Sequence, residues 1–210
     1  MRRRIFALSL LVSLPITATH VAALENPAEN RHYFTLQNRQ LKLNPSQIEV
    51  LEFFTYSCEH CNAFESILDP WQKKLPRDVT FRRIPVAFRE DFVFHQKLYY
   101  AIEALGLVEQ LHHKVFSAIH VERKRLNTVE QVRAFAATHG VDQNQFIQTI
   151  ESFSVMTKVQ QANALVKGYA IEGTPSIGVN GRWLTSGSMA GSHARSLHVA
   201  EYLIGLARKG

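Results

Sequence analysis

Residues 50–65 read VLEFFTYSCEHCNAFE, and this stretch decides the fold. It begins as an apolar, aromatic-rich run of strand length that leads directly into a Cys-x-x-Cys motif at Cys58 and Cys61. Apolar residues then recur at helical spacing, at Phe64, Ile67, Leu68 and Trp71. This order predicts a dithiol at the junction between a strand and a helix.

The predicted position of the dithiol favours thiol chemistry. The first turn of a helix has unsatisfied backbone N–H groups and the positive end of the helix dipole, so it stabilises a sulfur anion. We expect Ser57 to be the N-cap, Cys58 to lie in the first turn, and Cys61 to lie one turn deeper. Cys58 is therefore predicted to be the nucleophile and Cys61 the resolving thiol. His60 would lower the pKa of Cys58 by donating a hydrogen bond or carrying positive charge.

The Cys-x-x-Cys motif has two other interpretations. It could be half of a zinc site, but zinc needs about four ligands and the chain has only 2 cysteines, so histidines would have to supply the rest. It could be a structural disulfide, but a bridge across so short a loop removes little entropy from the unfolded chain. We therefore expect a redox dithiol, no metal site and no cofactor.

Glu52 is a carboxylate within an otherwise apolar run, where unpaired burial would be costly. It could accept a proton from Cys61, or it could form a salt bridge with Arg83 on a neighbouring strand. The sequence is compatible with both the proton acceptor and the salt bridge. Other histidines, among them His95, His112 and His113, lack the spacing of metal ligands and are expected to be structural.

Residues 171–183 read IEGTPSIGVNGRW and predict a return to the sheet. The pair Asn180-Gly181 between two short strand-like runs is typical of a type I′ hairpin. Pro175 stands just before the first of these runs, and taken alone it would be expected to follow a trans bond at the start of an edge strand.

The run LEFF at residues 51–54, CEHC at 58–61 and then Phe64-Glu65 together resemble the DsbA family of periplasmic thiol:disulfide oxidoreductases. That family typically carries Cys-Pro-His-Cys, whereas Glu59 stands in the proline position here, which is expected to change the redox potential and not the reaction class. The resemblance implies a cis bond between Thr174 and Pro175, beside the cysteines, where substrate binds. It also implies that Glu52 corresponds to the family's acidic residue beneath the site.

The resemblance extends over nearly the whole chain after the first 23 residues, and it implies a thioredoxin-like α/β fold with an inserted all-helical domain. We expect a signal peptide at 1–23, a first thioredoxin-like part at 24–89, a helical insertion at 90–170, and a second thioredoxin-like part at 171–210. Short-range signals predict a first strand at 33–36, a strand at 79–85, a helix at 129–138 with a capping box from Asn127 to Glu130, and a final helix at 193–209.

The first residues carry the pattern of a secretory signal peptide. Arg2, Arg3 and Arg4 precede an apolar run at 5–16, and small residues at 21–23 provide a cleavage site. The run is shorter than the roughly 20 residues that a membrane span needs. Removing those arginines from the formal net charge of +6 leaves +3, so no nucleic-acid partner is expected. The predicted location is the periplasm.

Several functions are compatible with this pattern. The family resemblance implies donation of the Cys58–Cys61 disulfide to reduced secreted polypeptides by a monomer, with reoxidation by a membrane quinone reductase of DsbB type. A disulfide isomerase or reductase would share the site, although isomerases of this fold usually have an additional N-terminal dimerisation domain. A secreted metallochaperone could bind copper(I) through the two cysteines and His60. A plain binding module would not need this motif at a helix start.

Overall fold

The computed structural model describes residues 26–210, so the expected signal peptide at 1–23 lies outside the described part. The strands are β1 (Phe34–Thr35), β2 (Ile48–Phe54), β3 (Val79–Pro85), β4 (Ser176–Val179) and β5 (Trp183–Ser186). The helices are α1 (Glu59–Gln72), the short 3-10 helix η1 (Glu90–Phe92), α2 (Val93–Ala104), α3 (Val108–His120), α4 (Val129–Thr138), α5 (Gln143–Ile150), α6 (Phe153–Gly168), α7 (Gly187–Ala190) and α8 (His193–Lys209). None of these helices is both long enough and apolar enough to cross a membrane.

The strands form one mixed sheet in the order β1-β5-β4-β2-β3. The central strand β2 is buried along its whole length, in keeping with its apolar residues, although Glu49 and Glu52 are buried with them. It runs parallel to β3 and antiparallel to β4, and the register places Glu52 directly beside Arg83 on β3 and Ile177 on β4. The end of β2 leads into α1 and therefore sets the position of the dithiol.

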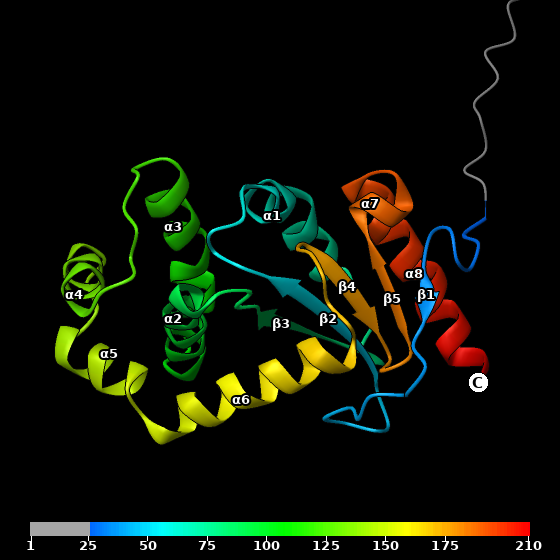
Figure 1. The fold of residues 1–210 in the computed structure, drawn as a ribbon, viewed down its shortest axis with the longest axis horizontal. Helices are drawn as coiled ribbons and strands as arrows, with labels where there is room; N and C mark the ends of the chain where they lie inside the picture. The colour runs from blue at the N-terminus through cyan, green and yellow to red at the C-terminus, as the bar shows by residue number, and fades with distance from the viewer. Residues whose placement is uncertain (1–25) are drawn as a thin grey trace, which may run out of the picture.

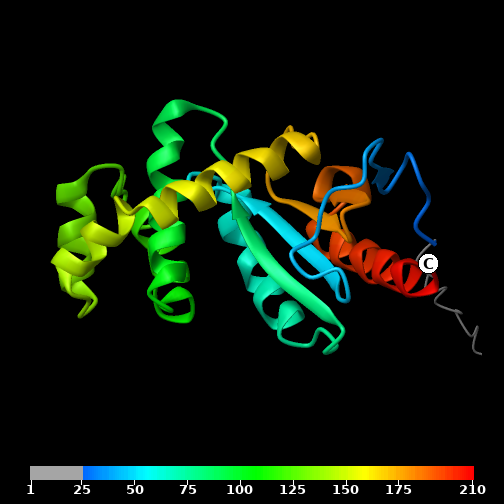
Figure 2. The ribbon, with the colours of Figure 1, turned by 90° about the horizontal axis from the view of Figure 1, so that it is seen from below.

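The two faces of the sheet are covered by different helices. Val50 of β2 packs in one apolar cluster with Phe64 and Leu68 of α1 and with Leu203 of α8, so α1 and α8 cover one face (Figure 2). Residues of the opposite face, such as Phe53, pack in a second cluster with the helices that follow β3. Helices α2 to α5 gather at one end of the sheet, and the long α6 leads from them back to β4 (Figure 1).

Local sequence signals located most elements well. The strand at 79–85 and the helices at 129–138 and 193–209 have the expected bounds, and Asn180 and Gly181 have the positive φ angles, 54° and 66°, of a type I′ turn. The first strand is shorter than expected, because only Phe34 and Thr35 pair with β5. The short helix α7 was not anticipated.

The predicted capping box at α4 was wrong by one residue. The N-cap is Thr128, whose hydroxyl accepts a hydrogen bond from the backbone N–H of Gln131 at 3.3 Å. The Gln131 side chain in turn accepts a hydrogen bond from the backbone N–H of Asn127 at 3.1 Å. Thr128 and Gln131 therefore occupy the N-cap and the third helical position of a capping box, but the Gln131 side chain reaches the N–H of Asn127, one residue before the N-cap.

Candidate active site

Cys58 is itself the N-cap of α1. Its backbone is extended, with φ −90° and ψ 115°, and its Sγ accepts a hydrogen bond from the backbone N–H of Cys61 at 3.2 Å. The expectation that Ser57 caps the helix was wrong, because the sulfur takes the place of the usual serine or aspartate oxygen. Ser57 Oγ instead lies 3.2 Å from Nδ1 of His95. The reactive sulfur thus points directly at the unsatisfied N–H groups of the first turn.

This environment acidifies the Cys58 thiol. The hydrogen bond with the Cys61 side chain contributes most to lowering the pKa of Cys58 from 9.0 to about 5, while burial opposes the shift. Hydrogen bonds from the Thr174 side chain and from the backbone amides of Cys61 and His60 also lower it. Near neutral pH Cys58 is therefore a thiolate, the form that reacts in thiol–disulfide exchange.

Cys61 has the opposite character. Both cysteines are free in the structure, but Cys58 is half-buried whereas Cys61 is completely buried. Burial raises the pKa of the Cys61 thiol, and the hydrogen bond and charge of Cys58 raise it further. The two thiols therefore differ in both access and charge, as the sequence led us to expect.

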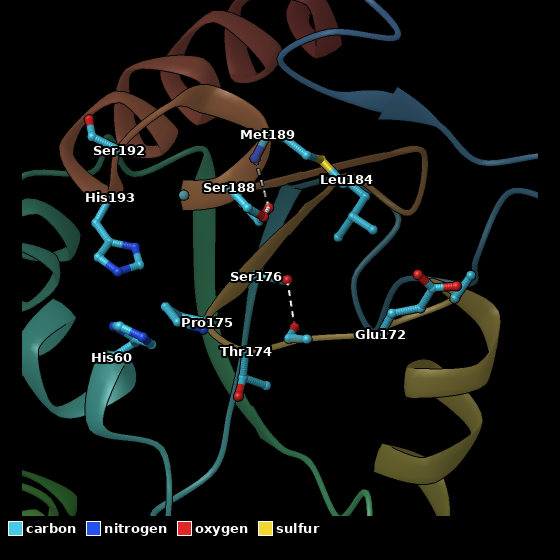
Figure 3. A pocket seen from close by; sticks show the side chains of 14 residues that line it. His60, Glu172, Thr174, Pro175, Ser176, Leu184, Ser188, Met189, Ser192 and His193 are labelled. Carbon is cyan, nitrogen blue, oxygen red and sulfur yellow. Dashed lines mark hydrogen bonds between the residues drawn. The ribbon is translucent and has the colours of Figure 1, made fainter.

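Thr174 and Pro175 lie beside the dithiol. The bond between them is cis, as expected, and the carbonyl oxygen of Thr174 is 3.4 Å from Cys58 Sγ. Both residues also line a cavity of about 570 Å³ that extends from α1 to α7 and to Glu172 (Figure 3). Its walls combine apolar side chains, among them Leu184 and Met189, with several serines.

His60 and Glu59 lie on the exposed side of the first turn of α1. The ring of His60 faces the ring of His193 across one end of the cavity, with 6.0 Å between their centroids (Figure 3). Among the residues that the structure describes, the His60 ring makes no hydrogen bond with Cys58. The expectation that the His60 ring lowers the pKa of Cys58 is therefore not met; the backbone amide of His60 contributes to lowering it instead.

Glu52 is completely buried in β2, and its charge interacts with both Cys58 and Cys61. Its Oε2 is 3.1 Å from Nε of Arg83, but the Nε–H of Arg83 is directed at Glu65 Oε1 at 3.3 Å. Within residues 26–210, neither oxygen of Glu52 receives a hydrogen bond. Burial raises the pKa of Glu52 well above 4.5, and the charge of Glu65 adds to this effect against the opposing charge of Arg83. Glu65, and not Glu52, is therefore the main carboxylate partner of Arg83.

Glu65, which the sequence offered either as a member of the Glu52 network or as a solvated helix carboxylate, anchors a buried polar chain whose other members, His112 and Tyr56, the sequence did not reveal. Besides binding Nη2 of Arg83 at 2.8 Å, it accepts a hydrogen bond from Nε2 of His112 at 3.3 Å. Burial alone would raise the pKa of Glu65, but His112 and Arg83 outweigh it and lower the pKa. Nδ1 of His112 then accepts a hydrogen bond from the Tyr56 hydroxyl at 2.9 Å. A carboxylate four residues after Cys61, on the buried face of the helix, was the available signal.

Comparison with known proteins identifies similar chains. Residues 49–200 match the family model of the DSBA-like thioredoxin domain. The chain is 40% identical over 202 residues to the thiol:disulfide interchange protein DsbA of Bordetella parapertussis, covering 95% of this chain and 96% of the relative. It is 37% identical to the protein of the same name from Burkholderia cepacia, with 93% of each chain covered. The crystal structure of Pseudomonas aeruginosa DsbA superposes with a TM-score of 0.84 at 36% identity, covering 87% of this chain and 95% of that one.

Proposed function

The chain belongs to the family of DSBA-like thioredoxin domains and is a protein disulfide oxidoreductase, and we propose that it acts as an oxidant that donates a Cys58–Cys61 disulfide to secreted polypeptides. The feature that supports this direction most is the set of hydrogen bonds to Cys58 Sγ, since those of the Cys61 side chain, Thr174 and the backbone N–H groups at the helix terminus lower the pKa of Cys58 to about 5. Stabilising the thiolate stabilises the reduced protein, so the disulfide form readily passes its oxidising equivalents to a substrate.

The proposed reaction has two exchange steps. A substrate thiolate attacks Sγ of Cys58, the Cys58–Cys61 bond breaks, and Cys61 leaves as a thiolate that takes up a proton. A second thiolate of the substrate then attacks the substrate sulfur of the mixed disulfide and releases Cys58 as a thiolate. The substrate dithiol loses two electrons and becomes a disulfide, while the enzyme disulfide becomes a dithiol. The low pKa of Cys58 makes it a good leaving group in the second step.

Glu52 is proposed to exchange a proton with Cys61. Burial favours the protonated form of Glu52 by raising its pKa, and when Glu52 is ionised its charge contributes to raising the pKa of Cys61. In the oxidising direction the neutral acid can donate a proton to the departing Cys61 thiolate. When the enzyme is reoxidised, the carboxylate can accept that proton again. Arg83 and Glu65, which are buried next to it, would compensate the charge.

Substrate binding is proposed to use the backbone at Thr174. An extended polypeptide can pair with this segment as an added strand, which would bring its cysteine to Cys58. The cavity of about 570 Å³ beside Pro175 could accept neighbouring substrate side chains. This arrangement recognises backbone more than sequence, which suits an oxidase that serves many polypeptides.

The cellular setting is also part of the proposal. We infer secretion to the periplasm by the signal peptide at 1–23, action as a monomer, and reoxidation by a membrane quinone reductase of DsbB type. The named relatives are thiol:disulfide interchange proteins, and thiol oxidation needs a compartment in which disulfides persist.

Trapping of mixed disulfides tests the proposed function. Cys61→Ser retains the reactive thiolate but cannot resolve the mixed disulfide, so it should accumulate adducts with secreted proteins, whereas Cys58→Ser should not. The oxidised wild-type protein should also convert a reduced, unfolded protein with two cysteines to its disulfide form. Equal trapping by both variants, or trapping by Cys58→Ser alone, would refute the assigned roles.

A further inference from the structure

A second hollow lies at Ser57, the residue before the reactive cysteine. It has a volume of about 290 Å³ and lies where the loop before α1 meets the inserted helices. It reaches the dithiol through Ser57, the residue next to Cys58, whereas the larger cavity reaches it through Thr174. The two hollows share no lining residue, so a polypeptide bound at Cys58 can place different side chains in each.

His95 gives this second hollow a fixed geometry. The side chain is buried, and its Nε2 donates a hydrogen bond to the backbone carbonyl of Arg125 at 2.9 Å. Because Nε2 carries the proton in the neutral ring, Nδ1 accepts from the Ser57 hydroxyl at 3.2 Å. His95 therefore holds Arg125 at a set position relative to Ser57, and burial keeps it neutral by lowering its pKa.

The charges around the hollow leave one cation uncompensated. The guanidinium of Arg89 lies over the ring of Phe92, with 4.6 Å from its carbon to the ring centroid, and forms an ion pair with Asp91. Arg125 also lines the hollow, and within residues 26–210 it has no carboxylate partner. With His95 neutral, the hollow presents a partly apolar floor and a net positive charge.

We propose that this hollow is a second substrate subsite, which binds an aspartate or glutamate side chain of the polypeptide, with Arg125 as the cation that recognises it. The proposal rests on the proposed function, since it concerns substrates that react at Cys58. The hollow begins at Ser57, the residue before Cys58, so we place the acidic residue two or three positions from the reacting cysteine, about 7–10 Å along an extended chain. Its methylene groups would contact Phe92 while its carboxylate meets Arg125.

The test is a set of peptide oxidation rates with the oxidised full-length enzyme. Reduced peptides carry one central cysteine and either glutamate or glutamine, two or three positions away on either side. Two peptide molecules reduce one Cys58–Cys61 disulfide: the first forms the mixed disulfide at Cys58, and the second releases Cys58 and leaves as a disulfide-linked peptide dimer. The measured quantity is the glutamate-to-glutamine ratio of second-order rate constants, compared between wild type and Arg125→Ala so that intrinsic differences in peptide reactivity cancel. Lys124→Ala is the matched control, because Lys124 is the adjacent exposed cation but pairs with Glu122 and lies outside the hollow.

We expect the ratio in the wild type to exceed that in Arg125→Ala by roughly two- to fivefold at one of the positions, as for a solvent-exposed ion pair. The difference should shrink at high salt, and Lys124→Ala should keep the wild-type ratio. Arg125→Glu should prefer lysine over glutamate at the same position. Equal ratios in wild type and Arg125→Ala, or an equal loss in Lys124→Ala, would overturn the subsite. Failure of the wild type to oxidise any peptide would instead contradict the proposed function.

Discussion

At the residue level, Cys58 combines two roles that are usually separate. Its sulfur caps α1 by accepting the Cys61 N–H, and the same sulfur is the nucleophile. A thiolate is a better acceptor than a thiol, so capping is strongest in the reduced, ionised form. The helix terminus therefore contributes directly to the difference in stability between the reduced and oxidised states, which is the difference that determines the redox potential.

Glu59 should weaken the oxidising power. It occupies the first turn of α1 next to the thiolate, and it repels charge on Cys58 only in the reduced protein. At about 6 Å and with the high effective dielectric of an exposed site, Coulomb's law gives roughly half to one pKa unit. Glu59→Gln should therefore lower the Cys58 pKa and make the protein more oxidising. Titration of thiolate absorbance would show it, and an unchanged or raised pKa in Glu59→Gln would exclude the effect.

Glu52 should make stability fall as the pH rises. The folded protein holds the pKa of this buried carboxyl well above 4.5, so between 4.5 and the folded value the native state binds more protons than the unfolded chain. The contribution of Glu52 to the free energy of unfolding is therefore fully present below about pH 4.5, and it is lost as the pH rises to the pKa of Glu52 in the folded protein. Glu52→Gln resembles the neutral acid and should lose less stability on going from pH 5 to pH 8. Urea unfolding at several pH values gives the free energy of unfolding of both proteins. If it changes with pH in parallel for wild type and Glu52→Gln, the raised pKa of Glu52 is contradicted.

At the element level, the loop before α1 is attached to the inserted helices by histidines. Nδ1 of His112 accepts from the Tyr56 hydroxyl, Nε2 of His120 bonds the Tyr56 carbonyl at 2.8 Å, and His95 bonds Ser57. The first two come from α3 and the third from α2. The insertion therefore holds the segment that positions Cys58, in addition to covering the sheet.

This attachment should weaken in acid. Burial lowers the pKa of His112 below 6.5 in the folded state, so as the pH falls below 6.5 the unfolded chain takes up protons that the folded protein does not. Stability is therefore lost on the acid side of pH 6.5. His112→Gln should show a smaller loss between pH 7 and pH 5.5, whereas His198→Gln, at a side chain that is 43% exposed, should retain the wild-type slope. If stability falls equally with pH in the wild type and both variants, His112 does not cause the loss of stability in acid.

The contact between β4 and the end of α6 leaves no room for a methyl group. A Cβ on Gly178 would lie 2.4 Å from the ring of Tyr169, which is completely buried and accepts a hydrogen bond from the Gly181 N–H. Gly178→Ala should therefore destabilise the fold by about 1–3 kcal/mol. Gly205→Ala in α8 meets nothing within 4 Å and should stabilise by up to about 1 kcal/mol. The denaturant midpoints of the two variants and the wild type measure these changes. If Gly178→Ala is as stable as the wild type, the ring of Tyr169 can move to make room for the methyl group.

At the level of the whole molecule, sequence patterns within a few residues predicted the helices, strands and turns that interactions between neighbouring residues determine. The run before Cys58, the helical spacing after it and the pair Asn180-Gly181 each specify local geometry, so the elements and the dithiol were found. Contacts between distant residues were not predictable in this way. His112 lies 47 residues from Glu65, and nothing in its local sequence indicates that partner. Similarly, the choice between Ser57 and Cys58 as N-cap depends on His95, which takes the Ser57 hydroxyl.

The central claim is that the fold stabilises the reduced dithiol and so makes its disulfide an oxidant. The most direct test is the equilibrium of the wild-type Cys58–Cys61 pair with glutathione, followed by acid quenching and counting of alkylated thiols. We expect the pair to stay largely reduced until glutathione disulfide is in large excess over its reduced form. If the pair instead becomes oxidised with only a trace of glutathione disulfide among excess glutathione, the protein is a reductant and the claim is wrong.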